Sequence, residues 1–406
     1  MNFIKRYIQT RFGKKRPRKR NEDAEKVSRI RKKRRKCRYK INFIFPVLAV
    51  VLLALFLITV YKNWCYRSYR VLSTSTQEDT QSTDYTQLGD YLLKYTSGSA
   101  NLLDIDGNSM WSETYEMSDP VAEVCDSTAV IYDQKGNNMV IVGESGKIGS
   151  VSTDKPILKA RVASQGVVAA ILEDGDTTWV NFYSTKGEEI ATAKTRVDSP
   201  GYPVDLSVSP DGLLIMVSYM YVEDSKTTSY VAFYNFGDTG QDQVDNIVSG
   251  YTYADTLVPQ VQYLQTGLSV SFSDAGFVIY KGKQIPKVSK EVKADSEIIS
   301  TFYDDEHVGM IYKSGDSSDQ YTLVVYDTKG NLKVEENFDI EYTKIKISND
   351  QIIMNNDSQI AIYNMNGHKK FSGTIKEGTI QDVFHVDGNR YQVVIDSGIE
   401  TIKLKM

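Results

Sequence analysis

One short phrase recurs along this chain and constrains its fold more than any other feature. An apolar strand ends near an aromatic residue, a polar turn with a glycine follows, and another strand begins. The turn glycines Gly107, Gly146 and Gly187 lie 39 and 41 residues apart. Gly330 and Gly367 lie 37 residues apart. A period of roughly 40–50 residues with about four strands per period is typical of β-propeller blades. The copies are LLDIDGN (102–108), MVIVGESGK (139–147), VNFYSTKGE (180–188), LVVYDTKGN (323–331) and IAIYNMNGH (360–368), with weaker copies VAFYNFGDTGQ (231–241) and FVIYKGKQ (277–284).

The segments between the copies also read as paired strands. PVDLSVSPDGLLIMVSY (203–219) predicts an inner hairpin, and its turn, Ser209 to Gly212, suits a type I geometry. We therefore predict that residues 88–406 form an all-β domain, a β-propeller with eight blades, or with seven as the alternative. The expected units are 88–118, 119–158, 159–197, 198–252, 253–293, 294–338, 339–376 and 377–406.

The last unit contains only three strand patterns. A ring closes best when one blade takes a strand from the other end of the chain, because closure covers an edge that otherwise invites aggregation. We expect the missing strand to come from Tyr69–Ser75 or from Asp84–Gly89. A stack of β-sandwiches is the competing architecture, but it would not repeat one turn phrase at this period.

An apolar run without ionisable residues precedes the β domain. It extends from Ile41 to Val60, and twenty helical residues span about 30 Å, the thickness of a bilayer's hydrocarbon core. Tyr61, Trp64, Tyr66 and Tyr69 follow it as an interfacial aromatic belt would. The sequence therefore predicts one transmembrane helix over residues 41–61.

This apolar run separates a basic N-terminal segment from an acidic remainder of the chain. Residues 1–40 hold 19 of the 48 Lys and Arg residues and three acids, whereas the remainder carries 29 bases against 49 acids. The positive-inside bias places the N-terminus in the cytoplasm and the large domain outside, in a single-pass cell-membrane protein. The flank YKNWCYRS (61–68) lacks the small residues that a signal peptidase needs, so we expect the helix to remain as a signal anchor.

The basic tail, residues 1–40, has two candidate partners. Met1–Phe12 has the pattern of a short amphipathic helix, and the bases that follow it suit anionic lipid at the inner leaflet. Clustered bases also bind nucleic acid, but no aromatic platform or folded reader accompanies them, so lipid is favoured. Residues 62–87 are rich in Ser, Thr and Gln and read as a linker with a possible closing strand.

Three cysteines do not suggest a fold held by disulfides. Cys37 lies on the predicted cytoplasmic side, which leaves Cys65 and Cys125 outside. One of these is beside the membrane and the other is in a strand pattern, so unpaired thiols are expected, with a Cys65–Cys125 pair left open.

No motif predicts a metal, phosphate or nucleophile site. His307, His368 and His385 each lack a partner at zinc-ligand spacing, and solvated positions in turns or at strand edges are expected for them. The segment Gly143–Lys147 resembles part of a phosphate loop, but it lacks the four-residue gap between glycines and reads as a hairpin turn.

The acidic clusters also favour structural roles. Asp104–Asn108 looks like the start of a calcium loop, but the twelfth position is Tyr115 rather than Glu. Asp304–Glu306 and Glu173–Asp176 read as solvated loops. We therefore predict no catalytic, cofactor-binding or metal-ligating residues and no cofactor.

The chain resembles a family of uncharacterised membrane proteins of Gram-positive bacteria, whose function is unknown, over its whole length from the helix onward. The resemblance rests on the basic tail, the single span and three β segments. It implies the membrane placement and a propeller similar to WD40-like and quinoprotein-type propellers. Only Trp111 and Trp179 stand where quinoprotein blades dock tryptophans, so quinone binding is not expected. The segments are LGDYLLKYTSGSANLLDIDGNSMWS (88–112), GYPVDLSVSPDGLLIMVSY (201–219) and VAFYNFGDTGQ (231–241).

Two classes of function fit this pattern. The first is a non-enzymatic binding or scaffold module for an envelope protein or a cell-wall polymer. The second is a propeller enzyme acting on glycans or with a quinone, and a weaker third is a sensor coupled to the basic tail. An enzyme needs convergent carboxylates or a cofactor pocket at the channel mouth. A scaffold instead presents an apolar or Tyr-rich patch, and the chain has 27 Tyr residues.

Overall fold

The structure, a computed structural model, divides the chain into two compact units, residues 1–64 and 65–406. It describes residues 25–32, 46–57, 59, 63–76, 83–175, 177–196, 200–223, 225–314 and 320–406.

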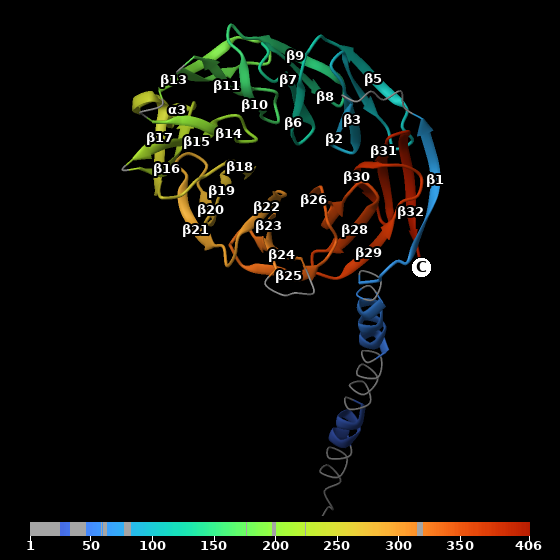
Figure 1. Cartoon of the computed structure of the whole chain (residues 1–406). Helices are drawn as coiled ribbons and strands as arrows, with labels where there is room; N and C mark the ends of the chain where they lie inside the picture. Colours follow the sequence, from blue (N-terminus) through green and yellow to red (C-terminus); the bar gives the residue numbers. More distant parts are fainter. Residues whose placement is uncertain are drawn as a thin grey trace, which may run out of the picture. The chain divides into compact units, whose positions relative to one another are not determined.

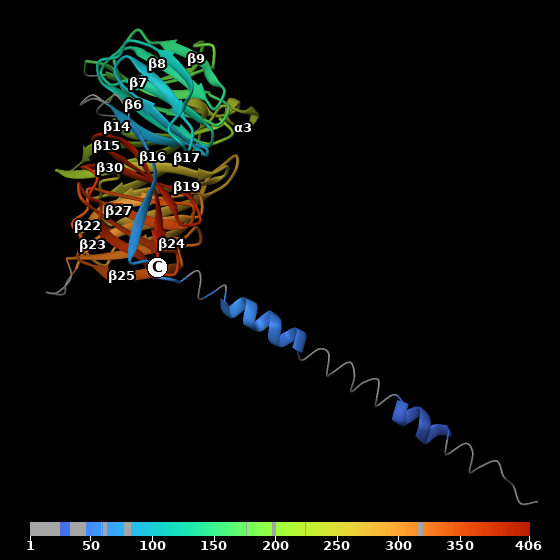
Figure 2. The same cartoon turned by 90° about the vertical axis from the view of Figure 1, so that its right-hand side faces the viewer.

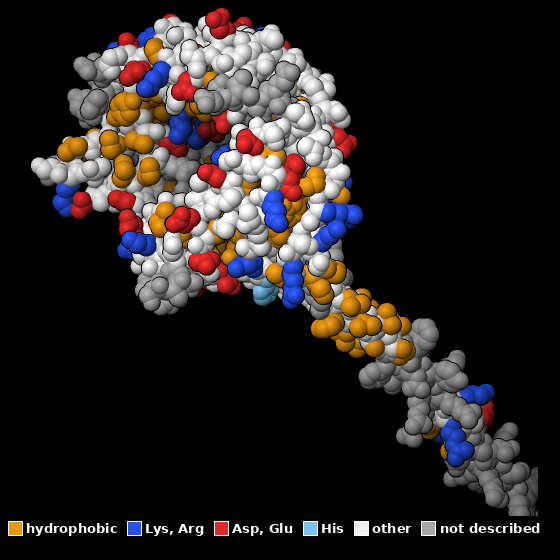
Figure 3. All heavy atoms as spheres, turned by 45° about the vertical axis from the view of Figure 1, so that its right-hand side comes forward, with side chains coloured by type: hydrophobic (Ala, Val, Ile, Leu, Met, Phe, Trp, Pro, Cys, Tyr) orange, Lys and Arg blue, Asp and Glu red, His pale blue; other side chains and the backbone are white. Residues whose placement is uncertain are grey.

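The first unit contains helices over residues 25–32 and 46–57. Apolar side chains surround the second helix, and Val50, Leu52 and Phe56 are each more than half exposed (Figure 3). Among the described helices, none combines the length and the apolar character needed to cross a bilayer. Residues 41–45, 58 and 60–61 of the expected span lie outside the described residues, so the membrane span stays a prediction.

The second unit is a ring of eight four-stranded antiparallel sheets (Figure 1). This confirms the prediction of an eight-bladed β-propeller, and the seven-bladed alternative was wrong. The first strand of each sheet faces the axis, and the fourth lies on the outside. The strands of blades 1 to 4 are β2 (Asp84–Leu88), β3 (Tyr91–Tyr95), β4 (Ser99–Leu103), β5 (Ser109–Thr114); β6 (Pro120–Cys125), β7 (Thr128–Asp133), β8 (Asn138–Gly143), β9 (Gly146–Ser152); β10 (Ile157–Val162), β11 (Val168–Asp174), β12 (Thr177–Tyr183), β13 (Glu189–Arg196); and β14 (Tyr202–Val208), β15 (Leu214–Glu223), β16 (Lys226–Asn235), β17 (Ile247–Ala254).

Blades 5 to 8 follow in the same order around the ring. Two short helices, α3 (Asp238–Gln241) and the 3-10 helix η1 (Val244–Asn246), precede them in the connection between β16 and β17. The strands of blades 5 to 8 are β18 (Gln260–Gln265), β19 (Leu268–Ser273), β20 (Gly276–Lys281), β21 (Lys287–Lys293); β22 (Ile298–Tyr303), β23 (His307–Lys313), β24 (Tyr321–Asp327), β25 (Leu332–Phe338); β26 (Lys344–Ser348), β27 (Gln351–Asn355), β28 (Gln359–Asn364), β29 (Lys369–Thr374); and β30 (Ile380–Asp387), β31 (Arg390–Ile395), β32 (Gly398–Lys405), with β1 (Ser68–Thr76) as the outer strand.

Strand β1 completes the eighth blade from the other end of the chain. It pairs antiparallel with β32, from Ser68 opposite Lys405 to Thr76 opposite Gly398 (Figures 1 and 2). Residues 69–75, one of the two segments expected to close the ring, lie within this strand. The other expected segment is not the closing strand: Asp84–Leu88 is β2, the innermost strand of blade 1.

The recurring phrase is a specific turn between the third and fourth strands of a blade. In blade 6, the Asp327 carboxylate accepts the backbone N–H groups of Lys329 and Asn331, each at 2.9 Å. Gly330 has a φ of +76° there, a backbone conformation that residues other than glycine rarely adopt. Asp104, Ser184 and Asn364 accept N–H groups two and four residues ahead in the same way in blades 1, 3 and 7.

The register of the outer strand shifts directly after this turn. In blades 3, 6 and 7 the shift falls at Tyr183, Tyr326 and Tyr363, the last aromatic of the third strand. A bulge of this kind increases the local twist of the strand.

The hydrophobic core lies between neighbouring blades. For example, Tyr132 and Ile141 of blade 2 share one buried cluster with residues of blade 3.

Candidate functional site

One group of charges lies on the inner strands of blades 2 to 4. Asp205 on β14 is fully buried, and its carboxylate lies 2.7 Å from the Lys159 ammonium and 3.5 Å from the Arg161 guanidinium. Arg161 also forms an ion pair with Glu123 on β6. The other Asp205 oxygen accepts the backbone N–H of Val261 at 2.8 Å. The acids of this cluster are thus held by bases and backbone.

A second group lies on the inner strands of blades 7 and 8. The Lys346 ammonium is 2.5 Å from the Asp382 carboxylate and 3.5 Å from the centre of the Phe384 ring. Lys344 lies 3.4 Å from the other Asp382 oxygen. Burial lowers the pKa of Lys346, and the Asp382 carboxylate opposes that shift. This acid, too, is neutralised by neighbouring bases.

The channel mouth where the inner strands end encloses about 470 Å³. Asp304 lies in its lining, and its carboxylate is 3.1 Å from Nδ1 of His307, which raises the pKa of that histidine. The Asp304 carboxylate also accepts the backbone N–H of Glu306 at 2.8 Å. Within the described part of the chain, no three potential metal ligands gather in one place.

The remaining sequence candidates lie apart from one another. The hairpin predicted at Gly143–Lys147 is confirmed, with Gly143 paired to Gly146. His368 donates its backbone N–H to Asn364 in a turn. His385 is buried, contrary to the expectation that it would be solvated. It packs beside Tyr391, and burial lowers its pKa.

The cysteine expectation is confirmed for the two described cysteines. Cys65 is exposed and free, and Cys125 is half-buried and free. Burial raises the pKa of the Cys125 thiol, which lies 3.5 Å from the Ser164 hydroxyl.

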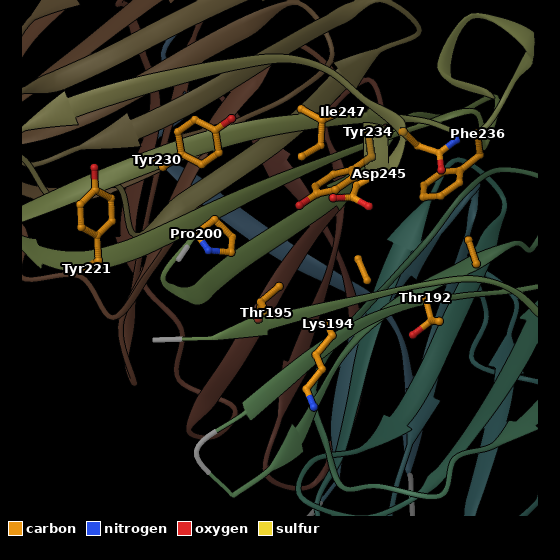
Figure 4. Close-up of a pocket in the computed structure, with 13 residues that line it drawn as sticks. Thr192, Lys194, Thr195, Pro200, Tyr221, Tyr230, Tyr234, Phe236, Asp245 and Ile247 are labelled. Atoms are coloured by element: carbon orange, nitrogen blue, oxygen red, sulfur yellow. The ribbon is translucent and has the colours of Figure 1, made fainter. Parts of the chain in front are cut away.

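A groove of about 860 Å³ opens between blades 3 and 4 near the outside of the ring (Figure 4). One wall is β13, the outer strand of blade 3. Ala191 and Ala193 turn toward blade 4 and leave space because they are small. Thr195, on the same side, is buried with its hydroxyl 2.6 Å from that of Thr178.

The opposite wall is aromatic and belongs to blade 4. Tyr230 and Tyr234 project from β16, Phe236 comes from the connection that follows, and Ile247 is the first residue of β17 (Figure 4). Phe236 stacks on Phe182 of blade 3, with ring centres 5.0 Å apart. This stack forms the point at which the two walls meet.

Tyrosine hydroxyls join the aromatic wall into one unit. The hydroxyl oxygens of Tyr219 and Tyr234 are 2.6 Å apart, and the rings of Tyr219 and Tyr230 stack with centres 6.3 Å apart. Burial raises the pKa of Tyr234 to about 12, and the Asp245 carboxylate adds a smaller upward contribution. The two bonded hydroxyls are therefore neutral at physiological pH and hold the rings of Tyr219 and Tyr234 next to each other.

Two residues at the end of the groove have unusual backbones. Asp245 and Asn246 have φ values of +55° and +60°, although neither is glycine. They lie where the connection from β16 turns into β17. Non-glycine residues with such left-handed backbone angles are strained and cluster at functional sites. Lys194 also borders the groove, but its side chain points away from the aromatic wall and lies over Trp179, 5.1 Å from the ring (Figure 4).

The sequence analysis did not identify this groove. A signal was present, because the copy VAFYNFGDTGQ departs from the other turns and follows a tyrosine-rich pair of strands. What could not be read from the pattern is that β13 would leave space opposite those tyrosines.

The model of a family of unknown function, DUF5711, matches residues 61–404. The chain belongs to the DUF5711 family. No curated protein matches it significantly. The DUF5711 match supports the expectation that the chain resembles a family of unknown function.

Solved structures resemble the DUF5711 domain in fold. Sqt1 from Saccharomyces cerevisiae is 11% identical, with a TM-score of 0.54, over 85% of this chain and 100% of that one. Sqt1 from Chaetomium thermophilum is 11% identical, with a TM-score of 0.53, over 84% and 98%. BamB from Moraxella catarrhalis is 14% identical, with a TM-score of 0.47, over 83% and 100%. At these identities the likeness to the two Sqt1 structures concerns the β-propeller fold alone.

Proposed function

We propose that this protein is a non-enzymatic binding module, anchored in the cell membrane with its propeller outside the cytoplasm, and that it holds another envelope protein in the groove between blades 3 and 4. The observation that carries the proposal is the aromatic wall of the groove, formed by Tyr230, Tyr234 and Phe236. Tyr is enriched at protein interfaces because it combines a large apolar ring with a hydroxyl.

The two acids on the inner strands support a binding role over an enzymatic one. A glycan-cleaving site needs a pair of carboxylates free to act as acid, base or nucleophile. Asp205 and Asp382, on the inner strands, each lie within ion-pair distance of lysines. Carboxylates paired with lysines in this way are not free to attack or protonate a substrate, which suits a structural role.

The membrane part of the proposal rests on the sequence. The apolar run of residues 41–60 and the 19 bases that precede residue 41 favour an anchor with a cytoplasmic N-terminus. Protease added to spheroplasts should digest the propeller linker from outside while the basic tail stays protected. The reverse pattern would refute this topology.

Photocrosslinking in intact cells tests the binding role. A benzophenone amino acid replaces Tyr230 in the groove, and the control replaces Tyr321, a partly buried strand tyrosine of blade 6. We expect the Tyr230 position to capture one envelope protein that the Tyr321 position does not capture. Equal capture from both positions, or capture of polysaccharide alone, would contradict the proposal.

A further inference from the structure

The groove runs along the backbone of strand β13. Five consecutive residues of this strand, from Ala191 to Thr195, line it. Successive side chains of a strand point to opposite faces, so a cavity confined to one face would touch only alternate residues. Contact with all five places the open edge of the strand inside the groove.

That edge has no partner strand among the described residues. The sheet of blade 3 runs in the order β10, β11, β12, β13, so β13 pairs on one side only. An edge strand presents unpaired N–H and C=O groups, which proteins usually protect with charged side chains. The stretch from Ile190 to Ala193 carries no charge, and Ile190 is 51% exposed.

The space beside this edge comes from small side chains at one register position. Ala191 pairs with Phe182 directly before the outer-strand bulge. The equivalent residues in blades 6 and 7 are Val334 and Phe371, both buried against the neighbouring blade. Alanine at this position leaves unfilled the volume that larger side chains fill in blades 6 and 7.

The charge of the groove is negative on its aromatic side. Asp245 and Lys194 are the charged residues of the lining, and the Lys194 ammonium lies over Trp179, away from the aromatic wall. Asp245 therefore remains to face an occupant. The chain beyond residue 40 carries 49 acids against 29 bases, which favours approach of a basic partner.

We propose that the groove accepts an extended, basic segment of a partner polypeptide, which adds to blade 3 as a fifth strand along β13. Alternate side chains of the segment pack between Ala193 and the ring of Tyr230, and a Lys or Arg lies opposite Asp245. Five residues of β13 offer about 17 Å of edge, enough for main-chain hydrogen bonds to supply affinity. This inference rests on the proposed function and specifies how the partner is held.

Peptide selection on the full chain in detergent tests the mode of binding. The probe is a phage-displayed library of random peptides about ten residues long, the length of a strand. Counter-selection uses the Ala193→Trp chain, whose indole fills the groove. We expect enriched peptides to alternate apolar and polar residues and to carry a Lys or Arg at a fixed position.

Synthetic versions of the enriched peptides then separate main-chain from side-chain recognition. N-methylation of every second amide should weaken binding by at least about tenfold when it blocks the amides that face β13. It should have little effect when it blocks the amides that face away from β13. Asp245→Asn should weaken binding of the basic peptides, whereas Asp242→Asn, in the same connection but outside the groove lining, should not.

Three outcomes would overturn the inference: no enrichment over the Ala193→Trp chain, equal binding by peptides methylated in either phase, or no effect of Asp245→Asn. Thermal unfolding of each variant checks that it is folded, and the N-methylated arms need no variant at all. If crosslinking from Tyr230 succeeds but methylation has no effect, the scaffold role stands and strand addition fails.

Discussion

The hydroxyl of Tyr230 occupies the space where a side chain at residue 250 would lie, and residue 250 is glycine. A Cβ on Gly250 would come within 2.0 Å of the Tyr230 hydroxyl oxygen. Gly250 belongs to β17, the strand that pairs with β16. The missing side chain lets the Tyr230 ring lie along the sheet and face the groove, so this pair of residues sets the shape of the aromatic wall.

Replacing Gly250 by alanine should therefore move Tyr230 without unfolding the domain. The atoms in conflict are at the end of a side chain that can rotate, so we expect unfolding free energy to change by less than about 1 kcal/mol. Capture of the partner by a benzophenone at position 192, which also lines the groove and leaves Tyr230 in place, should fall. Gly98→Ala, where a Cβ has open space, is the matched control. Unchanged capture by the Gly250→Ala chain would show that ring placement is unimportant.

The Tyr219–Tyr234 hydroxyl pair should couple energetically. Both side chains are buried, so removing one hydroxyl leaves the other without this partner. Tyr219→Phe and Tyr234→Phe should each cost about 1–2 kcal/mol, and the double variant should cost less than their sum. Urea unfolding of the four proteins gives the coupling energy. Strict additivity would argue that the two hydroxyls do not bond.

Buried tyrosines should make the domain sensitive to alkali. Burial raises the pKa of Tyr95, Tyr132, Tyr234 and Tyr363 from 10 to about 12. Between pH 10 and pH 12 the unfolded chain releases these protons and the folded chain keeps them. Stability is thus fully present below pH 10 and falls by roughly 1.4 kcal/mol per pH unit for each such tyrosine. Tyrosinate absorbance should rise together with loss of far-UV circular dichroism, and gradual ionisation without unfolding would contradict this.

The closing strand should be essential for folding. A chain that begins at Cys65 keeps β1, whereas a chain that begins at residue 78 lacks it and exposes the edge of β32. We expect a cooperative thermal transition for the first and aggregation or non-cooperative melting for the second. A synthetic peptide of residues 65–77 should restore the transition when added in trans. Equal melting of the two truncated chains would show that the ring closes without β1.

The fold could be predicted from the sequence because its turns use local chemistry. The side chain of Asp327 and the φ value of Gly330 are dictated by neighbours within four residues, and the same arrangement recurs around Asp104, Ser184 and Asn364. The period of these turns then gave the blade count. The closing strand also followed, since a three-stranded last unit needs a fourth strand.

The groove could not be predicted because it depends on contacts between blades. Ala191 and Ala193 look ordinary within β13, and only the tyrosines of the next blade turn their small size into a cavity. His385 illustrates the same limit: its neighbours in sequence suggested a solvated strand edge, whereas packing against Tyr391 buries it. The ion pairs of Asp205 likewise join residues 44 or more positions apart.

Amide hydrogen exchange along β13 tests the central claim most directly. The exchange rates of the full chain alone are compared with those of the full chain bound to the partner segment that the benzophenone at position 230 captures. Edge amides between Glu189 and Arg196 should exchange quickly in the free protein and become protected in the complex, while the outer strand β25 of blade 6 stays unchanged. Protection confined to the channel mouth, or no change along β13, would contradict the claim that this groove holds the partner.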